Sequence, residues 1–287
     1  MTMRNPLARG AHRLRLAAYA VDEASHAVYR PGGALDAVRP PVRRIAAADL
    51  RAVLASGFAD FGAYRSDVIF LCLLYPLLGL VLERLAFDYE MLPLLFPIAS
   101  GFALVGPFAA VGLYEMSHRR EQGGDASWAD AFGVFRSPSF GAILLLGLLL
   151  IALYLAWLLA AEGIYRVTLG PAPPASIEAF LCDLFATGAG WSMIGLGIGA
   201  GCIFAVLTLA ISVVAFPLLL DRPIGVNTAI WTSLRVVAAN PGPMALWGAI
   251  VVAGLVIGAI PLFVGLIIVL PVLGHATWHL YRRLVPR

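Results

Sequence analysis

The last 44 residues, from Met244 to Arg287, read MALWGAIVVAGLVIGAIPLFVGLIIVLPVLGHATWHLYRRLVPR and decide how often the chain crosses a membrane. From Val236 to Tyr281 the sequence contains no Asp, Glu, Lys or Arg. A helix needs about 20 apolar residues to cross the hydrocarbon layer, so this stretch is too long for one span and fits two short ones. Pro261 lies between them, where its missing N–H and its ring break a helix. We expect a hairpin of two spans, at residues 244–260 and 262–280.

The composition of the whole chain indicates that lipid is its solvent. The 287 residues are 61% hydrophobic and 13% charged, whereas soluble domains carry about 25% charged residues. Four further apolar runs precede the hairpin, so six spans are expected in total. In the second run, Pro93, Pro97 and Gly101 allow a broken helix. The four runs are residues 68–86, 91–114, 140–161 and a span within 184–220 that starts near Trp191.

The basic residues predict the orientation of these spans. All 20 are arginines. If the N-terminus is cytoplasmic, 18 of them fall on the inner side and only Arg84 and Arg166 on the outer side, as the positive-inside rule requires. An odd number of spans would place the arginines after Tyr281 on the wrong side. We therefore expect a bacterial inner-membrane protein with cytoplasmic N- and C-termini, whose inner arginines meet anionic lipid headgroups.

Three short segments with helical spacing of apolar residues precede the odd-numbered spans, near residues 50–61, 128–135 and 230–237. Such segments are typical of amphipathic helices that lie in the membrane interface. The expected fold is an all-α membrane protein with six transmembrane helices as three hairpins, each preceded by a short interfacial amphipathic helix. Residues 1–44 are expected to form an Arg-rich cytoplasmic tail and linker, and residues 45–287 the six-span transmembrane domain.

A set of acidic and histidine residues is expected at the inner ends of the even-numbered spans. Spacings of three and four residues place two pairs of them each on one helix face, which suits a metal or haem site. The sequence holds only one Glu-x-x-His pair, however, and two histidines supply half of a usual ligand set. The alternative is that these side chains bind headgroups, backbone ends and neighbouring arginines. The candidates are Glu115, His118, Asp221, His275 and His279.

Four alternating glycines in the fourth span form two overlapping GxxxG motifs, which allow another helix to approach closely. We expect packing within the monomer, with a homodimer through this span as the alternative. The residues are Gly195, Gly197, Gly199 and Gly201.

Three stretches of the chain resemble characteristic segments of an uncharacterised family of bacterial multi-pass integral membrane proteins, a domain of unknown function. They are GPFAAVGLYEMSHRREQG (106–123), NPGPMALWG (240–248) and LPVLGHATWHLYRRLV (270–285). The resemblance implies a multi-pass protein of the bacterial inner membrane and brings no reaction, ligand or cofactor with it.

The sequence therefore favours a membrane protein without enzymatic activity. It would act as a scaffold or assembly factor, or handle a small or lipidic molecule in the bilayer. No Walker loop, nucleophile elbow or HExxH motif is present, and we expect neither a cofactor nor a nucleic-acid partner under this first interpretation. A transporter or channel built from the three hairpins is the first alternative, although no ionisable residue lies at the centre of a span. A metal- or haem-binding redox accessory protein is the second.

Overall fold

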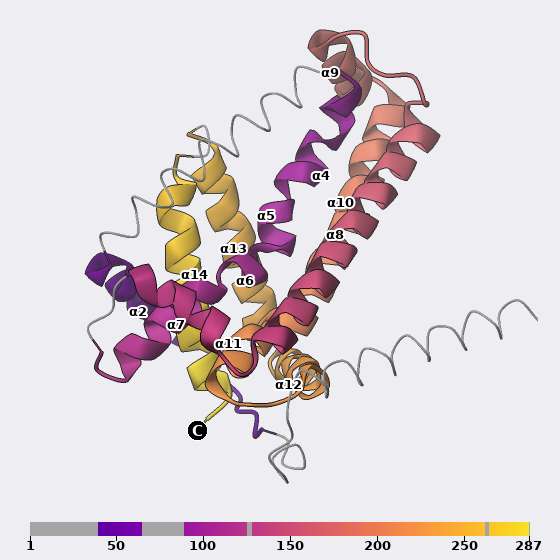
Figure 1. Cartoon of the computed structure of the whole chain (residues 1–287). Coiled ribbons are helices and arrows are strands. Elements are labelled where there is room, and N and C mark those ends of the chain that lie inside the picture. Colours follow the sequence, from indigo (N-terminus) through magenta and orange to yellow (C-terminus); the bar gives the residue numbers. More distant parts are fainter. Residues whose placement is uncertain (1–39, 65–88, 125–127, 262–263, 287) are drawn as a thin grey trace, which may run out of the picture.

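The computed structural model describes residues 40–64, 89–124, 128–261 and 264–286, and every regular element in these ranges is a helix (Figure 1). This confirms the predicted all-α class. In chain order the helices are α2 (Asp49–Ala63), η2 (Tyr89–Leu94), α4 (Leu95–Ala99), α5 (Gly101–Leu104), α6 (Gly106–Ala109), α7 (Val111–Glu121), η3 (Trp128–Arg136), α8 (Phe140–Thr168), α9 (Ile177–Ala186), α10 (Gly188–Ser212), α11 (Ala215–Asp221), α12 (Val226–Ala239), α13 (Pro241–Ala259) and α14 (Leu266–Leu284).

Two pairs of long helices form the frame of the molecule. Helix α8 packs along α10, α13 packs along α14, and the short helices α5 and α6 lie between the two pairs (Figure 1). By length and composition, α8, α10 with its extension α11, and α13 are able to cross a membrane. These correspond to the third, fourth and fifth predicted spans.

The other predicted spans are not seen as long apolar helices in the described residues. Helix α14 covers most of the predicted sixth span but ends in HATWHLYRRL, whose polar side chains lower its hydropathy. It is not among the candidate spans of the described residues. The first predicted span, residues 68–86, lies outside the described residues. The structure thus shows three candidate spans, and the arrangement of six remains a prediction.

The second predicted span, residues 91–114, is broken into short helices from η2 to α7, as its prolines allow. Pro93 and Pro107 have no N–H to donate to the preceding turn, and the helical pieces change at Ser100 and Val105. Pro271, in contrast, lies inside α14 without ending it. The prolines of the even-numbered spans therefore act differently from one span to the next.

The chain turns between α13 and α14 at the proline that predicted this hairpin. Helix α13 ends at Ala259, and the amide of Val264 donates to the carbonyl of Pro261 at 3.0 Å. The two helices approach closely at glycines, because a Cβ atom on Gly265 would lie 2.8 Å from the Cα atom of Gly258.

The three segments predicted as amphipathic helices are helical in the structure, as α2, η3 and α12. Helix α2 packs tightly on α14, where a Cβ atom on Gly57 would lie 2.7 Å from that of Ala276. The chain before α2 is also fixed, since the Ile45 amide donates to the Asn240 side chain at 2.8 Å. This end of the molecule, with α2, α7, α11, α12 and the last turns of α14, holds most of the buried core.

Helix α9 was not predicted from the sequence. It follows α8 and is capped at both of its junctions: Ser176 accepts from the amide of Ala179 at its start, and Thr187 accepts from the amide of Gly190 at the start of α10. The approach of α9 to α10 is close, because a Cβ atom on Gly190 would lie 2.2 Å from the Leu184 carbonyl oxygen. Only glycine fits there, so the turn holds α9 at a defined angle over the end of α10.

Candidate functional site

A buried carboxylate, Asp60, joins α2 to α7 and α14. Its Oδ2 atom accepts from the Ser117 hydroxyl at 2.6 Å and lies 2.9 Å from Nε2 of His279. Its Oδ1 atom accepts from Nη1 of Arg120 at 2.8 Å. Asp60 is 5% exposed, and Ser117 and His275 are each 1% exposed. We call these five residues, Asp60, Ser117, Arg120, His275 and His279, the Asp60 cluster.

The geometry of the Asp60 cluster determines which atom donates in each hydrogen bond. Ser117 has one hydroxyl proton, which it donates to Asp60. Nδ1 of His275, 2.8 Å from the Ser117 oxygen, must then be the donor in that contact. Burial raises the pKa of the Asp60 carboxyl, but the hydrogen bonds from His279 and Ser117 outweigh it and hold the pKa below its usual value. Asp60 is therefore a fixed negative charge that ties three helices together.

A second group of charges lies on the other side of α7. His118 is 3.6 Å from Glu115 and 3.8 Å from Asp221, between nitrogen and carboxylate oxygen. Arg282 binds Asp221 at 3.0 Å and Glu121 at 2.9 Å. Burial raises the pKa of Glu115, but the hydrogen bonds with His118 and Arg119 outweigh it and lower the pKa overall. This group, the Asp221 cluster, ties α7 to α11 and α14.

The five predicted candidates therefore separate into two clusters. Glu115, His118 and Asp221 meet in the Asp221 cluster, while His279 lies beside Asp60 and His275 contacts Ser117. Within the described residues, no three His, Cys, Asp or Glu side chains are grouped so as to hold a metal ion. Most groups of the two clusters are paired with one another, whereas Nε2 of His275 is buried without a partner among the described residues. The metal or haem site stays a prediction from the sequence alone.

Asp60 is the residue that sequence reasoning missed. It follows Leu50, Val53 and Gly57 at spacings of three and four, so it continues the apolar face of α2. An acidic residue in line with an apolar face is a recognisable indication of a buried polar contact.

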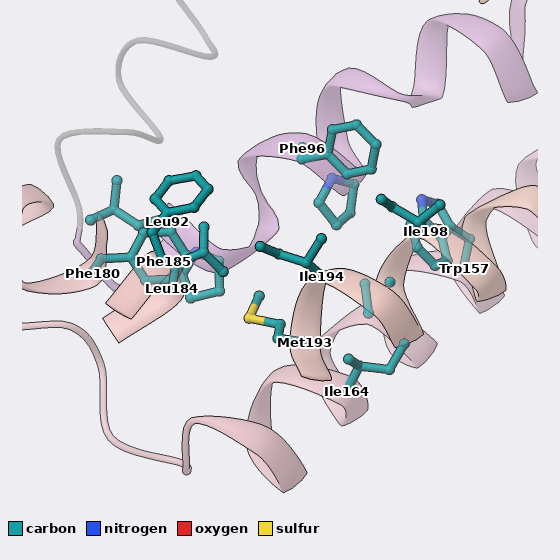
Figure 2. A pocket seen from close by; sticks show the side chains of 14 residues that line it. Leu92, Phe96, Trp157, Ile164, Phe180, Leu184, Phe185, Met193, Ile194 and Ile198 are labelled. Atoms are coloured by element: carbon teal, nitrogen blue, oxygen red, sulfur yellow. The ribbon is translucent and has the colours of Figure 1, made fainter. Parts of the chain in front are cut away.

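A pocket of about 340 Å³ lies at the opposite end of the molecule, where α9 meets α8, α10 and the first pieces of the broken span. Figure 2 shows aromatic and aliphatic side chains converging on it from all of these elements. We call it the α9 pocket. Its lining consists of Leu92, Pro93, Phe96, Pro97, Trp157, Ala161, Ile164, Phe180, Leu184, Phe185, Met193, Ile194, Gly197 and Ile198.

The α9 pocket offers a hydrocarbon surface. Every lining residue is apolar, and the indole N–H of Trp157 is already used, since it donates to the Ser100 hydroxyl at 2.8 Å. Trp157 is fully buried at the inner wall, whereas Phe96, Phe185 and Ile198 are more than half exposed at the rim. The pocket thus opens at the protein surface between Phe96, Phe185 and Ile198.

The depth of the pocket follows from its place on α10. Met193 to Ile198 are the sixth to eleventh residues of this helix, which at 1.5 Å per residue puts them roughly 8–15 Å from its start. If α10 crosses a membrane, the pocket lies within one half of the hydrocarbon layer, and α9 lies at its surface.

The glycine run of α10 has few close neighbours among the described residues. Among the described residues, nothing lies within 4 Å of a Cβ atom built on Gly195, Gly197 or Gly199, and Gly201 meets only the Trp157 ring, at 3.5 Å. Gly197 instead lines the α9 pocket. Gly201 therefore packs against α8, and packing of the other three glycines within the monomer stays a prediction.

Residues 95–221, a little under half of the chain, match the family model described as "Predicted integral membrane protein (DUF2189)", a family of unknown function. The match confirms the resemblance to an uncharacterised family of integral membrane proteins. It covers α4 to α11 and thus most of the α9 pocket, whereas two of the three stretches that carried the resemblance lie beyond residue 221. No curated protein and no solved structure matches the chain.

Proposed function

We propose that this integral membrane protein, related through residues 95–221 to the family DUF2189, holds the hydrocarbon chain of a lipid or lipid-like small molecule in the α9 pocket. The observation that carries the proposal is the pocket itself, a space of about 340 Å³ with an entirely apolar lining and an opening at the protein surface. Pockets for small ligands begin at about 300 Å³. A path for ions or polar solutes needs hydrogen-bonding groups along its wall, and this lining supplies hydrocarbon.

The volume of the α9 pocket limits the size of the ligand that it is able to hold. A water molecule occupies about 30 Å³ of liquid, and a methylene group is of similar size, so the α9 pocket holds on the order of ten carbons. That is one chain segment rather than a whole diacyl lipid. Lipid tails are as apolar as leucine, so the hydrophobic effect does not drive a chain from the bilayer into the pocket. Retention must come from close packing against side chains such as Trp157 and Met193.

Filling the pocket tests this function. Gly197→Leu adds a side chain at a lining position where the Cβ atom meets no neighbour among the described residues. Gly195→Leu is the matched control, two residues away on the same helix, equally open but outside the lining. Both variants are reconstituted in nanodiscs with a phosphatidylethanolamine that carries a diazirine on one acyl chain. Adducts are then located by mass spectrometry after photolysis.

We expect strong labelling of Met193 and Ile194 in the wild type and in Gly195→Leu, and much weaker labelling of them in Gly197→Leu. Labelling of the exposed residue Val256 on α13 serves as the reference for general contact with lipid. Equal labelling of Met193 and Ile194 in all three proteins would show that the chain does not enter the pocket.

The membrane arrangement we propose has six spans with both termini in the cytoplasm of a bacterium, which puts α9 on the outer side. It is supported by the distribution of arginines over the connecting segments. Cys182, exposed on α9, provides the test in a variant that retains no other cysteine. A membrane-impermeant maleimide should label it in intact spheroplasts, whereas a Gly124→Cys variant without native cysteines should react only after lysis. The reverse pattern would refute the orientation.

A further inference from the structure

A second cavity, separate from the α9 pocket, lies between the two helix pairs. It has a volume of about 350 Å³ and is lined by α5 to α7, α10, α13 and α14, with Val206 and Val252 exposed at its open side. None of its 23 lining residues is charged, and most are aliphatic or small. A charged ligand is therefore excluded, because an unpaired charge costs too much free energy in such surroundings. We call this space the central cavity.

One residue of the lining, Thr208, has a hydroxyl that no described residue satisfies. Thr208 is 3% exposed, and its Oγ1 atom is buried without a hydrogen-bond partner among the described residues. Helical serines and threonines usually donate to the carbonyl four residues earlier. Several in this chain do so, including Ser212, Thr232 and Thr277. Thr208 departs from that pattern at a position on the cavity wall.

The other buried hydroxyl without a partner in the described part of the chain belongs to Ser233 on α12. Ser233 does not line the central cavity, so it provides no comparable site. Burying a hydroxyl without a partner is costly, and at Thr208 a ligand in the cavity removes that cost.

The unpaired hydroxyl of Thr208 indicates what kind of group a ligand would place beside it. A threonine hydroxyl is able to donate or to accept a hydrogen bond. A hydroxyl group on the ligand complements it in either role, whereas a ketone is able only to accept.

We propose that the central cavity binds an uncharged, mostly hydrocarbon alcohol, whose hydroxyl bonds to Thr208 and whose chain fills the apolar space. At about 30 Å³ per water-sized unit, the cavity holds on the order of ten heavy atoms beside the hydroxyl. A lipid with a free hydroxyl and a free medium-chain alcohol share this chemistry. This site does not depend on the α9 pocket, so either proposal stands if the other fails.

Cys202 is a natural reporter, since it is exposed and lines the central cavity. In a Cys72→Ala, Cys182→Ser protein in nanodiscs, the rate of alkylation of Cys202 by N-ethylmaleimide is measured with increasing 1-decanol. Decane, 2-decanone, decanoate and decylammonium are compared at equal mole fraction in the lipid. The same probes acting on Cys182, in a variant without the other cysteines, report general effects on the bilayer.

We expect 1-decanol to slow alkylation of Cys202 but not of Cys182, decane and 2-decanone to protect it less, and the two ions not to protect it. Thr208→Val, which keeps the shape and removes the hydroxyl, should weaken protection by 1-decanol roughly 2- to 10-fold. Thr208→Ser should retain most of it. Thr232→Val is the control, since that buried hydroxyl donates to the Thr228 carbonyl and lies outside the cavity.

Different results overturn different parts of the proposal. Equal protection by decane and 1-decanol, unchanged by Thr208→Val, would refute the hydrogen bond and leave an unselective apolar cavity. No protection of Cys202 by any probe would refute the site. A shorter-chain lipid with a free hydroxyl, 1,2-dioctanoylglycerol, separates the two sources. Protection by 1-decanol alone assigns the cavity to a free alcohol, and protection by both assigns it to the lipid as well.

Discussion

Replacing Asp60 with Asn removes the charge that joins α2, α7 and α14 while keeping the shape of the side chain. A hydrogen bond to a charged group contributes about 1.5–3 kcal/mol. Because the hydrogen bond from Ser117 is buried, most of this contribution should be lost in Asp60→Asn. The bonds from Arg120 and His279 involve partly exposed side chains and contribute about 1 kcal/mol or less each. Because Asn keeps one acceptor, we expect a total loss of about 2–4 kcal/mol.

Thermal unfolding followed by circular dichroism in detergent measures this loss. A change of 1 kcal/mol shifts the midpoint by about 2–4 °C in proteins of 150–250 residues, so Asp60→Asn should lower it by on the order of 5–10 °C. Asp49→Asn is the matched control on the same helix. Its carboxylate pairs with Arg283 at 2.8 Å, but both side chains are more than a third exposed, so its midpoint should fall by only a few degrees.

The pH dependence has a defined sign. The folded pKa of Asp60 lies below its usual value of 3.8, so the stability it contributes is fully present above about pH 4 and is lost as the pH falls through the folded pKa. The gap between wild type and Asp60→Asn should therefore persist from pH 8 to pH 5. Equal midpoints for Asp60→Asn and Asp49→Asn, or a gap that closes between pH 8 and pH 5, would refute the reasoning.

Three further predictions concern packing. Gly57→Leu should destabilise the protein by about 1–3 kcal/mol or more through overpacking against Ala276, whereas Gly62→Leu, open at its Cβ, should leave the midpoint of thermal unfolding within a few degrees of wild type. Asn240→Ala should cost about 1–3 kcal/mol, because it leaves the amide of residue 45 without its acceptor, and proteolysis before α2 should become faster. If α10 pairs with a second copy at Gly199, whose Cβ position is open, chemical cross-linking in membranes should give a dimer with the wild type and mainly monomer with Gly199→Leu. An unchanged cross-linking yield would refute that homodimer.

The long apolar helices were predictable because their evidence is local. Twenty consecutive apolar residues and a proline between two runs define α8, α10 and the turn at Pro261 without reference to the rest of the chain. Sequence reasoning also anticipated the broken span, since Pro93 and Pro97 have no N–H to donate and Gly101 weakens a helix. Only the described ranges of these spans are tested by the structure.

The sites were less predictable because they depend on how helices meet. His275 and His279 share one face of α14, as their spacing indicated, but that face is turned toward α2. His279 thus pairs with Asp60 and not with Asp221, and His275 contacts Ser117, which donates to Asp60. The α9 pocket depends on the angle between α9 and α10, which a close contact at Gly190 determines. The spacing of apolar residues in the sequence does not predict the angle between these two helices.

The segment before α2 has a consequence for the order in which the protein is made. The amide of Arg43 donates to the carbonyl of Leu284 at 2.8 Å. This hydrogen bond joins one of the first described residues to one of the last, so it cannot form until residue 284 has been synthesised. At about 5–20 residues per second, synthesis of the intervening 240 or so residues takes on the order of 10–50 s. During that interval the segment has left the ribosome without its partner. Synthesis of α14, rather than of the helices before it, is therefore the step that allows the segment before α2 to form this contact.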